Sequence, residues 1–274
     1  NQGEKSVAIG SLAGQTNQGE NSVAIGSSAG QNNQSTDSVA IGIESGFTGQ
    51  GNQTTAIGCK SGRSDQGLNA TSVGVSAGYE KQGEGCVALG GGAGYRNQEP
   101  YAIAIGVAAG SDNQGRNAIA IGHVAGNVSQ APNSIVLNAS GVTLAGSSSG
   151  FFVRPISIGG ATNVLHYNTS TFELTYVSSS ETTKNTIKDL NIDTTIVADL
   201  KPKTYIYNNA EDAGEQIGYI AEEVAELNSH FATYETMEGE PKNINWNVIT
   251  VFLVEELKKL KLRVSELEET RTAP

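Results

Sequence analysis

The chain has 274 residues and a formal net charge of −11 at pH 7, with 34 Gly, 6% aromatic and 16% charged residues. So much Gly with so few aromatic side chains argues against an ordinary globular enzyme, whose close-packed core needs large side chains. The composition changes after Ser178: the net charge is −3 up to that residue and −8 beyond it. Neither part offers the basic face that neutralises phosphates, so we expect no nucleic acid partner.

Several other classes of protein are disfavoured by what the sequence lacks. Cys59 and Cys86 are the only cysteines, too few for a disulfide framework or a Cys-rich zinc site. We therefore expect neither a metal site nor a cofactor. The chain has no run of 18 apolar residues and no signal-peptide pattern, so no membrane partner is expected. It begins at Asn1 in the middle of a repeat, which predicts that it is a fragment of a longer protein.

A strict sixteen-residue repeat runs through the first half of the chain. A tetrapeptide of the Val-Ala-Ile-Gly type occupies residues 7–10, 23–26, 39–42, 55–58, 71–74, 87–90, 103–106 and 119–122, and an altered ninth copy occupies 135–138. A second Gly column stands at Gly14, Gly30, Gly46, Gly62, Gly78, Gly94, Gly110 and Gly126. A Gln column stands at Gln2, Gln18, Gln34, Gln50, Gln66, Gln82, Gln98, Gln114 and Gln130.

This repeat predicts a mainly β fold, a parallel β-solenoid of nine 16-residue coils over residues 1–138. Each coil must turn at the same place, and Gly permits the positive φ that such turns need. The β-branched, small, large-aliphatic pattern is a short strand with alternating faces. With coils about 4.8 Å apart, the rod would be about 43 Å long. The Gln column would form a ladder of amides, each bonded to its neighbours above and below.

The repeats resemble the head domains of trimeric autotransporter adhesins, which carry the same Ser-Val-Ala-Ile-Gly strand, as in 22–26. The resemblance implies parallel β-rolls that assemble in threes. The residues agree with this, because each coil offers few apolar side chains and no regular aromatic filling, so we expect a homotrimer that buries the apolar columns together. The solenoid would act as a spacer or, alternatively, as a receptor-binding surface. The repeats lack the flat Thr array of an ice-binding solenoid and the repeated Asp beside Gly pairs of a calcium-binding solenoid.

Residues 139–178 are predicted to be a β-rich connector. Ser and Gly surround the apolar pieces 142–144 and 151–153, and the segments 164–167 and 172–176 flank a polar turn, which predicts a β-hairpin. His166 has no second His or carboxylate at metal-ligand spacing, so we interpret it as a surface strand residue.

Residues 179–274 are predicted to form a small α+β domain that ends in a coiled-coil helix. Strands are expected at 204–207 and 243–246, a strand leading into a helix at 217–224, and a last helix from Val248 to Arg271. In that helix an a/d pattern is formed by Leu253, Leu257, Leu260, Val264 and Leu267. Fewer than three heptads are marginal alone, so the stripe would pack in a parallel three-stranded bundle or, alternatively, against the chain's own core.

The C-terminal part resembles the intramolecular chaperone domain of endosialidases, phage tail spikes and fibres, and giant-virus fibre proteins. The resemblance rests on the motifs Leu-Lys-Pro-Lys-Thr-Tyr at 200–205, Ile-Gly-Tyr-Ile-Ala-Glu-Glu-Val at 217–224 and Ile-Asn-Trp at 244–246, followed by the aliphatic helix. The segments 151–153 and 165–176 also resemble the region that precedes this domain in giant-virus fibre proteins. The family is also classed as a self-cleaving serine peptidase.

The resemblance implies a catalytic pair and a cleavage site. The family cuts its own chain just before a Ser whose partner Lys lies five positions later, which corresponds to Ser179 as nucleophile, Lys184 as general base and the bond between Ser178 and Ser179 as the cleavage site. Burial in an assembled trimer would supply the neutral amine that the chemistry requires. The chain departs from the family pattern, because no Arg stands between Ser179 and Lys184.

Together these features predict a homotrimeric surface fibre or tail spike of a virus or phage, located on the virion surface and extracellular on the mature particle. Its C-terminal domain would set the register of three chains, because a repeat without insertions can slip by one coil at little cost. The only enzymatic activity expected is a single self-cleavage, without external substrate. The alternative is a trimeric adhesin that binds a host-cell receptor or glycan through the solenoid and keeps an uncleaved chaperone domain. An enzymatic function on external substrates is not supported, because the sequence shows no carboxylate pair or catalytic triad in a cleft-forming segment.

Overall fold

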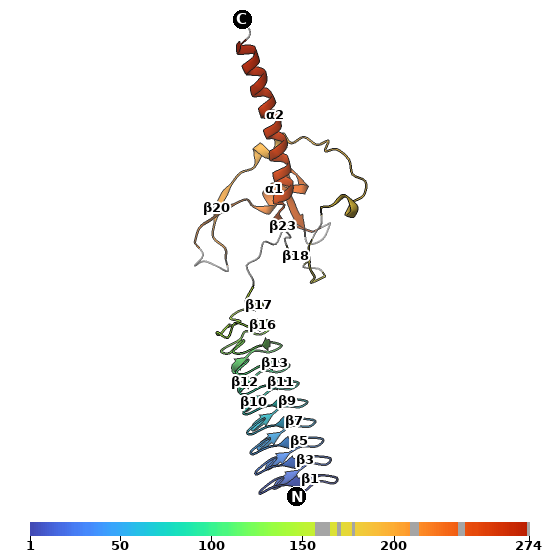
Figure 1. Ribbon diagram of the computed structural model, residues 1–274, viewed down its shortest axis with the longest axis vertical. Coiled ribbons are helices and arrows are strands. Elements are labelled where there is room, and N and C mark those ends of the chain that lie inside the picture. The colour runs from blue at the N-terminus through green and yellow to red at the C-terminus, as the bar shows by residue number, and fades with distance from the viewer. Residues whose placement is uncertain (157–164, 169–170, 177–178, 209–213, 235–238, 273–274) are drawn as a thin grey trace. The chain divides into compact units, whose positions relative to one another are not determined.

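A computed structural model describes the chain apart from residues 157–164, 169–170, 177–178, 209–213, 235–238 and 273–274 (Figure 1). The chain divides into two compact units, Asn1–Gly159 and Gly160–Pro274, which are described in turn.

The first unit is a parallel β-solenoid built from two sheets. One sheet holds, in spatial order, β1 (Val7–Ile9), β3 (Val23–Ile25), β5 (Val39–Ile41), β7 (Thr55–Ile57), β9 (Thr71–Val73), β11 (Val87–Leu89), β13 (Ile103–Ile105), β15 (Ile119–Ile121), β16 (Ser134–Asn138) and β17 (Gly150–Arg154). The other holds β2 (Thr16–Gln18), β4 (Asn32–Gln34), β6 (Thr48–Gln50), β8 (Ser64–Gln66), β10 (Glu80–Gln82), β12 (Arg96–Gln98) and β14 (Asp112–Gln114).

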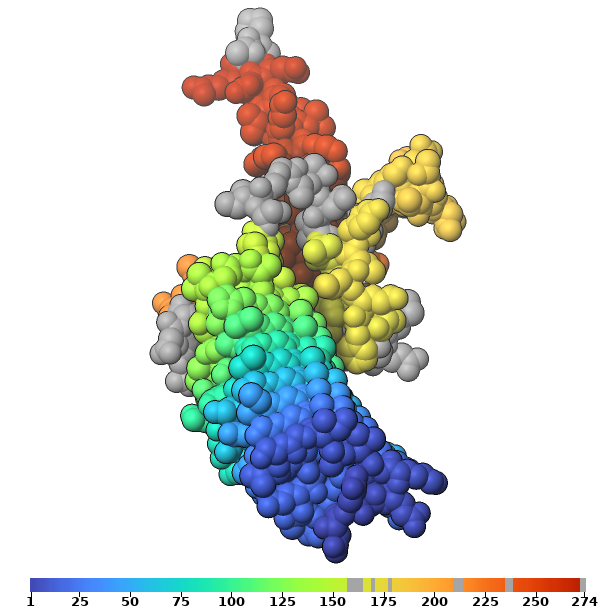
Figure 2. Space-filling view, turned by 60° about the horizontal axis from the view of Figure 1, so that its bottom comes forward, coloured from blue at the N-terminus to red at the C-terminus, as the bar shows by residue number. Residues whose placement is uncertain are grey.

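The register of the strands reproduces the sequence period. Val7 pairs with Val23 and Ile9 with Ile25, and the altered ninth copy keeps the step, since Ile119 pairs with Ile135. The predicted solenoid of 16-residue coils is therefore confirmed. Figure 2 shows successive coils, coloured from blue to green, stacked without interruption.

The interior of the solenoid is filled by small side chains and by Gln. The middle residue of each strand in the first sheet points inward and is fully buried in coils two to nine, as in Ala24, Ala40 and Ala88. The residues on either side of it point outward, so aliphatic side chains such as Ile57 and Ile105 remain more than a third exposed. A single chain thus leaves its largest apolar columns on the surface.

The two Gly columns are required for different reasons. Gly42 has a φ of 125°, and a Cβ there would lie 2.6 Å from the carbonyl oxygen of Gly58 in the next coil. Gly46 has a φ of 53°, and a Cβ there would lie 2.7 Å from the Oε1 of Gln50. The first column therefore lets successive coils approach, and the second makes room for the buried amide.

The Gln side chains form the predicted ladder over part of its length. From Gln50 to Gln114 each Nε2 donates to the Oε1 of the Gln in the next coil, at 3.0–3.3 Å, and Gln130 is the last acceptor. Each Nε2 also donates to a backbone carbonyl of its own coil, as Gln82 does to Thr71 at 3.1 Å. In the first coils the Nε2 of Gln34 bonds only backbone carbonyls, so the amide ladder does not continue there.

The altered ninth copy changes the interior at the end of the repeat. Asn138 stands in the first Gly column and is buried. Its Nδ2 donates to the carbonyl oxygens of His123 at 2.9 Å and Val142 at 2.8 Å. These carbonyls gain a side-chain partner at the point where the regular turn is lost, after which β17 adds one further strand to the sheet.

The two cysteines differ in environment, which predicts different reactivity. Burial raises the pKa of the Cys86 thiol from 9.0 to about 11, whereas Cys59 is only half-buried. Since the thiolate is the reactive form, we expect a maleimide to label Cys59 in the folded protein and Cys86 only after unfolding. Mass spectrometry of peptides from native and urea-treated protein measures this. Equal labelling of both residues in the native protein would contradict the buried position of Cys86.

The second unit combines short antiparallel strand pairs with helices. The predicted hairpin is present as β18 (Leu165–Tyr167) and β19 (Leu174–Tyr176), with His166 exposed on β18. The remaining elements are η1 (Glu181–Thr183), η2 (Thr195–Asp199), β20 (Lys203–Tyr205), β21 (Gln216–Gly218), α1 (Ala221–Leu227), η4 (Ser229–Phe231), β22 (Ala232–Tyr234), β23 (Pro241–Ile244) and α2 (Trp246–Thr272). The strands pair as β20 with β21 and β22 with β23.

One small core holds these elements together. Its buried members are Val197, Val224, Phe231, Ala232, Ile249 and Phe252. Phe231 and Phe252 meet edge to face with ring centroids 4.9 Å apart, a favourable arrangement for aromatic pairs. The core therefore joins η2, α1, η4 and β22 to the first turns of α2.

The last helix begins two residues earlier than predicted. The Oδ1 of Asn245 accepts a hydrogen bond from the backbone N–H of Val248, and its carbonyl accepts from Ile249. Asn245 therefore caps the helix, and Trp246 belongs to α2, whereas the sequence analysis placed it in the preceding strand.

Candidate functional site

The predicted catalytic segment lies at the start of the second unit, around η1. The Oγ of Ser180 accepts a hydrogen bond from the backbone N–H of Thr182, and the N–H of Lys184 donates to the carbonyl of Glu181 at 3.1 Å. Thr183 donates from its Oγ1 to the carbonyl of Ser180 at 2.8 Å. This short turn separates Ser179 from Lys184.

The structure of one chain does not bring the predicted pair together. Ser179 and Lys184 are both exposed, and no hydrogen bond joins them within the described part of the chain. Ser178, the other side of the predicted cleavage site, lies outside the described residues. A general base must lie within hydrogen-bond reach of the proton that it takes, in a site that excludes water. The Ser179–Lys184 pair therefore stays a prediction, and it needs a burial that one chain does not provide.

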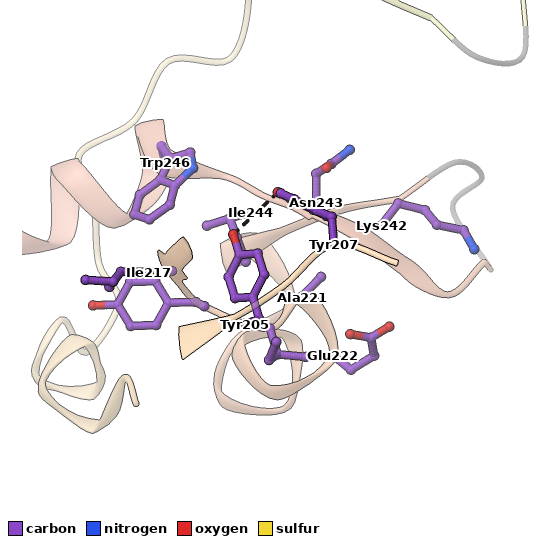
Figure 3. Close-up of a pocket in the computed structure, with 12 residues that line it drawn as sticks. Tyr205, Tyr207, Ile217, Ala221, Glu222, Lys242, Asn243, Ile244 and Trp246 are labelled. Carbon is purple, nitrogen blue, oxygen red and sulfur yellow. Dashed lines mark hydrogen bonds between the residues drawn. The ribbon is translucent and has the colours of Figure 1, made fainter. Parts of the chain in front are cut away.

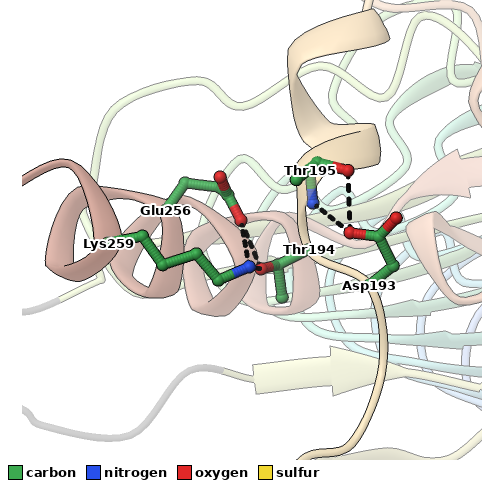
Figure 4. A network of polar contacts seen from close by, with 5 residues as sticks. All are labelled: Asp193, Thr194, Thr195, Glu256 and Lys259. Carbon is green, nitrogen blue, oxygen red and sulfur yellow. Dashed lines mark hydrogen bonds and ion pairs between the residues drawn. The ribbon is translucent and has the colours of Figure 1, made fainter. Parts of the chain in front are cut away.

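A polar cluster connects η2, which follows this segment, to the last helix (Figure 4). Thr194 is buried, donates from its hydroxyl to the Glu256 carboxylate, and accepts from the Nζ of Lys259 at 2.8 Å. Lys259 also pairs with Glu256 at 2.8 Å, and its hydrogen bond, together with that of Thr194, holds the pKa of Glu256 below its ordinary value. We call these three residues the Thr194 cluster.

The residue next to this cluster shapes the turn into η2. The Asp193 carboxylate accepts from the Thr195 hydroxyl at 2.7 Å and from its backbone N–H at 3.0 Å. These bonds lower the pKa of Asp193. The sequence analysis missed the Thr194 cluster because 62 residues separate Thr194 from Glu256, and no local spacing signals such a contact.

A groove of about 610 Å³ is lined by the two family-like motifs around β21 and the start of α2. In Figure 3 the rings of Tyr205 and Trp246 lie on two sides of the groove, with Ile244 between them. The hydroxyl groups of Tyr205 and Tyr207 lie 3.4 Å apart, and Tyr205 also carries a raised pKa because of this hydrogen bond. The lining offers aromatic surface with few charged groups, which suits contact with protein better than acid–base chemistry.

An apolar stripe on α2 faces solvent. The predicted heptad residues Leu253, Leu257, Leu260, Val264 and Leu267 are 45–65% exposed. The same spacing continues upstream through Thr250 to Trp246, a signal visible in the sequence that the analysis did not use. The sequence left two arrangements open for this stripe, a parallel three-stranded bundle and packing against the chain's own core. Among the described residues of α2, packing against that core is not observed beyond Phe252.

Two general searches of the described residues add no further site. No group of three or more His, Cys, Asp or Glu side chains there is placed to hold a metal ion. Within the same residues, none of the helices combines the length and apolar character needed to cross a membrane.

Three aromatic side chains of the solenoid, those of Phe47, Tyr79 and Tyr95, line up with Arg63 in a column along the repeats. The rings of Tyr79 and Tyr95 stack with centroids 4.8 Å apart, and the Arg63 guanidinium lies between Phe47 and Tyr79, 4.9 and 5.5 Å from the two ring centroids. Arg63 also forms a salt bridge with Glu44 at 2.9 Å. Ring faces that contact one another are not available to a sugar ring.

Comparison with known proteins gives one match, within the second unit. A search of curated proteins and a search of solved structures gave no match to the chain, so the likeness of the repeats to adhesin heads stays a prediction. Residues 179–232 match the family model described as chaperone of endosialidase. The match begins at the predicted nucleophile and contains η1, η2, β20, β21, α1 and η4. This match supports a C-terminal chaperone domain, and its position behind a β-solenoid fits a tail-fibre or spike-like protein.

Proposed function

We propose that the chain is one protomer of a homotrimeric surface fibre or tail spike of a virus or phage, exposed on the outside of the virion. The solenoid forms the shaft, and the C-terminal domain drives trimer assembly and then releases itself by cleavage. The observation that carries this proposal is the chaperone-of-endosialidase match at 179–232 behind a solenoid whose register repeats without insertion.

Exposed apolar surface supports the trimer. The first sheet turns the columns that begin at Val7 and Ile9 outward, and no charged residue stands in either column from the first coil to the ninth. The second sheet carries polar and charged residues at its outward positions, such as Glu80, Lys81 and Arg96. A continuous apolar face of this kind marks an interaction surface, and identical repeats on identical chains are complementary along their whole length.

Self-cleavage requires a change in the surroundings of Lys184. In the proposed reaction its neutral amine accepts the proton of the Ser179 hydroxyl, and the Oγ attacks the carbonyl carbon of Ser178. The C–N bond of the peptide breaks, the released amino group of Ser179 takes the proton, and water hydrolyses the resulting ester. Because Lys184 is exposed in one chain, neighbouring chains must enclose it together with Ser179 before it can act as a base. Cleavage would then follow assembly.

Denaturing gel electrophoresis tests the cleavage. We expect the wild-type chain to yield two fragments, of 178 and 96 residues, and we expect Ser179→Ala and Lys184→Met to remain full-length because each removes one partner of the reaction. Ser180→Ala is the matched control: it removes the neighbouring hydroxyl and should leave cleavage unchanged. Intact wild-type chain would refute self-cleavage, and cleavage abolished by Ser180→Ala but not Ser179→Ala would move the nucleophile by one residue.

Receptor binding through the solenoid, the alternative function, receives less support. The rings of Tyr79 and Tyr95 stack on each other, and the Arg63 guanidinium lies over the rings of Phe47 and Tyr79. Tyr101 lies over Gly85 and beside Arg116, whose guanidinium is 5.3 Å from the ring centroid. These contacts reduce the ring surface that the repeats offer to a ligand, so the fibre function is the better supported of the two.

A further inference from the structure

The charged residues beside the α2 stripe follow a pattern that the proposed trimer does not by itself explain. With Leu253, Leu260 and Leu267 at d positions and Leu257 and Val264 at a positions, the heptad assignment is fixed. The g positions that follow are Glu256 and Arg263, and the e positions are Lys261 and Glu268. These two g positions therefore hold one acidic and one basic residue, and so do these two e positions.

In a parallel coiled coil, a g residue faces the e residue five positions later on the neighbouring helix. Counting five from Glu256 leads to Lys261, and counting five from Arg263 leads to Glu268. Both pairs join opposite charges. A slip of one heptad in either direction would place Glu256 beside Glu268 or Arg263 beside Lys261, so it would replace attraction by repulsion.

We infer that three copies of α2 pack in parallel and in register along this stripe, with Glu256 and Arg263 of each copy paired with Lys261 and Glu268 of its neighbour. The inference rests on the proposed homotrimer, because cyclic three-fold symmetry makes the copies parallel. It goes further in assigning the register to these four residues. The occupant of the exposed stripe is thus a second and third copy of this chain.

The chain's own core occupies one side of α2 and leaves the stripe free. Ile249 and Phe252, at g and c positions of the first turns, are buried in that core. Trp246 and Thr250, at the d and a positions of the same turns, are exposed, as is the rest of the stripe. Glu256, at the next g position, lies where the side held by the core meets the exposed stripe.

The Thr194 cluster prepares Glu256 for this contact. Its carboxylate is fixed by Thr194 and Lys259 of the same chain, and two carboxylate oxygens can accept about four hydrogen bonds. Lys261 of a neighbouring copy can therefore donate a hydrogen bond to the Glu256 carboxylate without displacing Thr194 or Lys259. A side chain already held in one orientation loses less conformational freedom on pairing.

Charge reversal in the full-length chain tests the inference. To keep the Thr194 cluster intact, the variants are Arg263→Glu, Glu268→Arg and the double variant, compared by sedimentation velocity over a range of concentrations. Each single reversal introduces three repelling pairs per trimer and should raise the concentration for half-assembly about tenfold. The double variant should return to the wild-type value. Glu266→Arg is the control, because it changes the net charge as much as Glu268→Arg does but lies outside the e and g columns. Its concentration for half-assembly should match that of the wild type.

A cysteine at the stripe provides an independent measurement of the register. Leu267→Cys in a Cys59→Ser background should form a disulfide between two of the three copies on mild oxidation, because identical d positions meet only when the helices are parallel and in register. Three results would overturn the inference while the trimer remains: absence of this product from a trimeric sample, single reversals without effect, or single reversals whose effect the double variant does not restore. A wild-type chain that is monomeric at every concentration would instead overturn the proposed function.

Discussion

Replacing Gly90 with Ala is expected to lower the melting temperature of the solenoid by roughly 10 °C, the largest effect we expect from a single methyl group. Gly90 has a φ of 121°, in a region that L side chains rarely adopt, and a Cβ there would lie 2.8 Å from the carbonyl carbon and oxygen of Gly106. Backbone strain and the clash together should cost roughly 3 kcal/mol or more. The coils around Gly90 and Gly106 must then separate or distort.

The neighbouring residue offers a matched control for this substitution. A Cβ at Gly91 would find its nearest atom, the carbonyl oxygen of Val75, at 3.9 Å, an ordinary contact. Gly91→Ala should therefore leave the melting temperature within about 2 °C of wild type. Thermal unfolding followed by circular dichroism at fixed protein concentration compares the two variants. Equal melting temperatures of the two variants would show that the stacking of successive coils does not require the close backbone approach at the first Gly column.

Replacing Gln82 with Leu should destabilise the solenoid by about 3 kcal/mol through lost hydrogen bonds at nearly constant volume. The Gln82 amide donates to the Thr71 carbonyl at 3.1 Å and to the Gln98 Oε1 at 3.2 Å, and it accepts from Gln66 at 3.2 Å. Leu leaves the buried Oε1 of Gln98 without its donor. The penalty for an unsatisfied buried polar group accounts for much of the expected loss.

An exposed amide pair provides the control for the ladder. The Nε2 of Gln31 donates to the Oε1 of Gln15 at 2.9 Å on the surface of the solenoid. Gln31→Leu removes the same chemical group where water can replace it, so the change in unfolding free energy should stay within about 0.5 kcal/mol. Urea unfolding of both variants measures the difference. If Gln82→Leu is as stable as Gln31→Leu, the interior amides are not a main source of stability.

The solenoid could be predicted in detail because its determinants are local and repeated. Each coil repeats the Gly of the turns and the alternation of Val, Ala and Ile within 16 residues, and the observed register follows that period. The ladder was predicted for every Gln, yet Gln34 bonds only backbone carbonyls. An amide in this interior can reach either a neighbouring amide or a strand carbonyl, and spacing does not decide between the two.

The candidate site was less accessible to sequence reasoning. Ser179 and Lys184 were assigned through a resemblance, and both are exposed in this chain, so their environment in the proposed trimer depends on contacts that the sequence of one chain does not reveal. The contact of Thr194 with Glu256 and Lys259 spans 62 and 65 residues. Such contacts arise from the packing of η2 on α2, which no periodic pattern records. The helix start was misplaced because the capping role of Asn245 resembles the polar end of a strand.

The stacked register of the solenoid makes its length adjustable in whole steps. Every strand pairs with residues one period before and one period after it, so removing or duplicating one 16-residue unit would join two surfaces that already fit. Each step changes the reach of the shaft by about 4.8 Å and leaves the interior, the turns and the outward apolar columns as they are. The length of the solenoid can therefore vary independently of the domain that follows it.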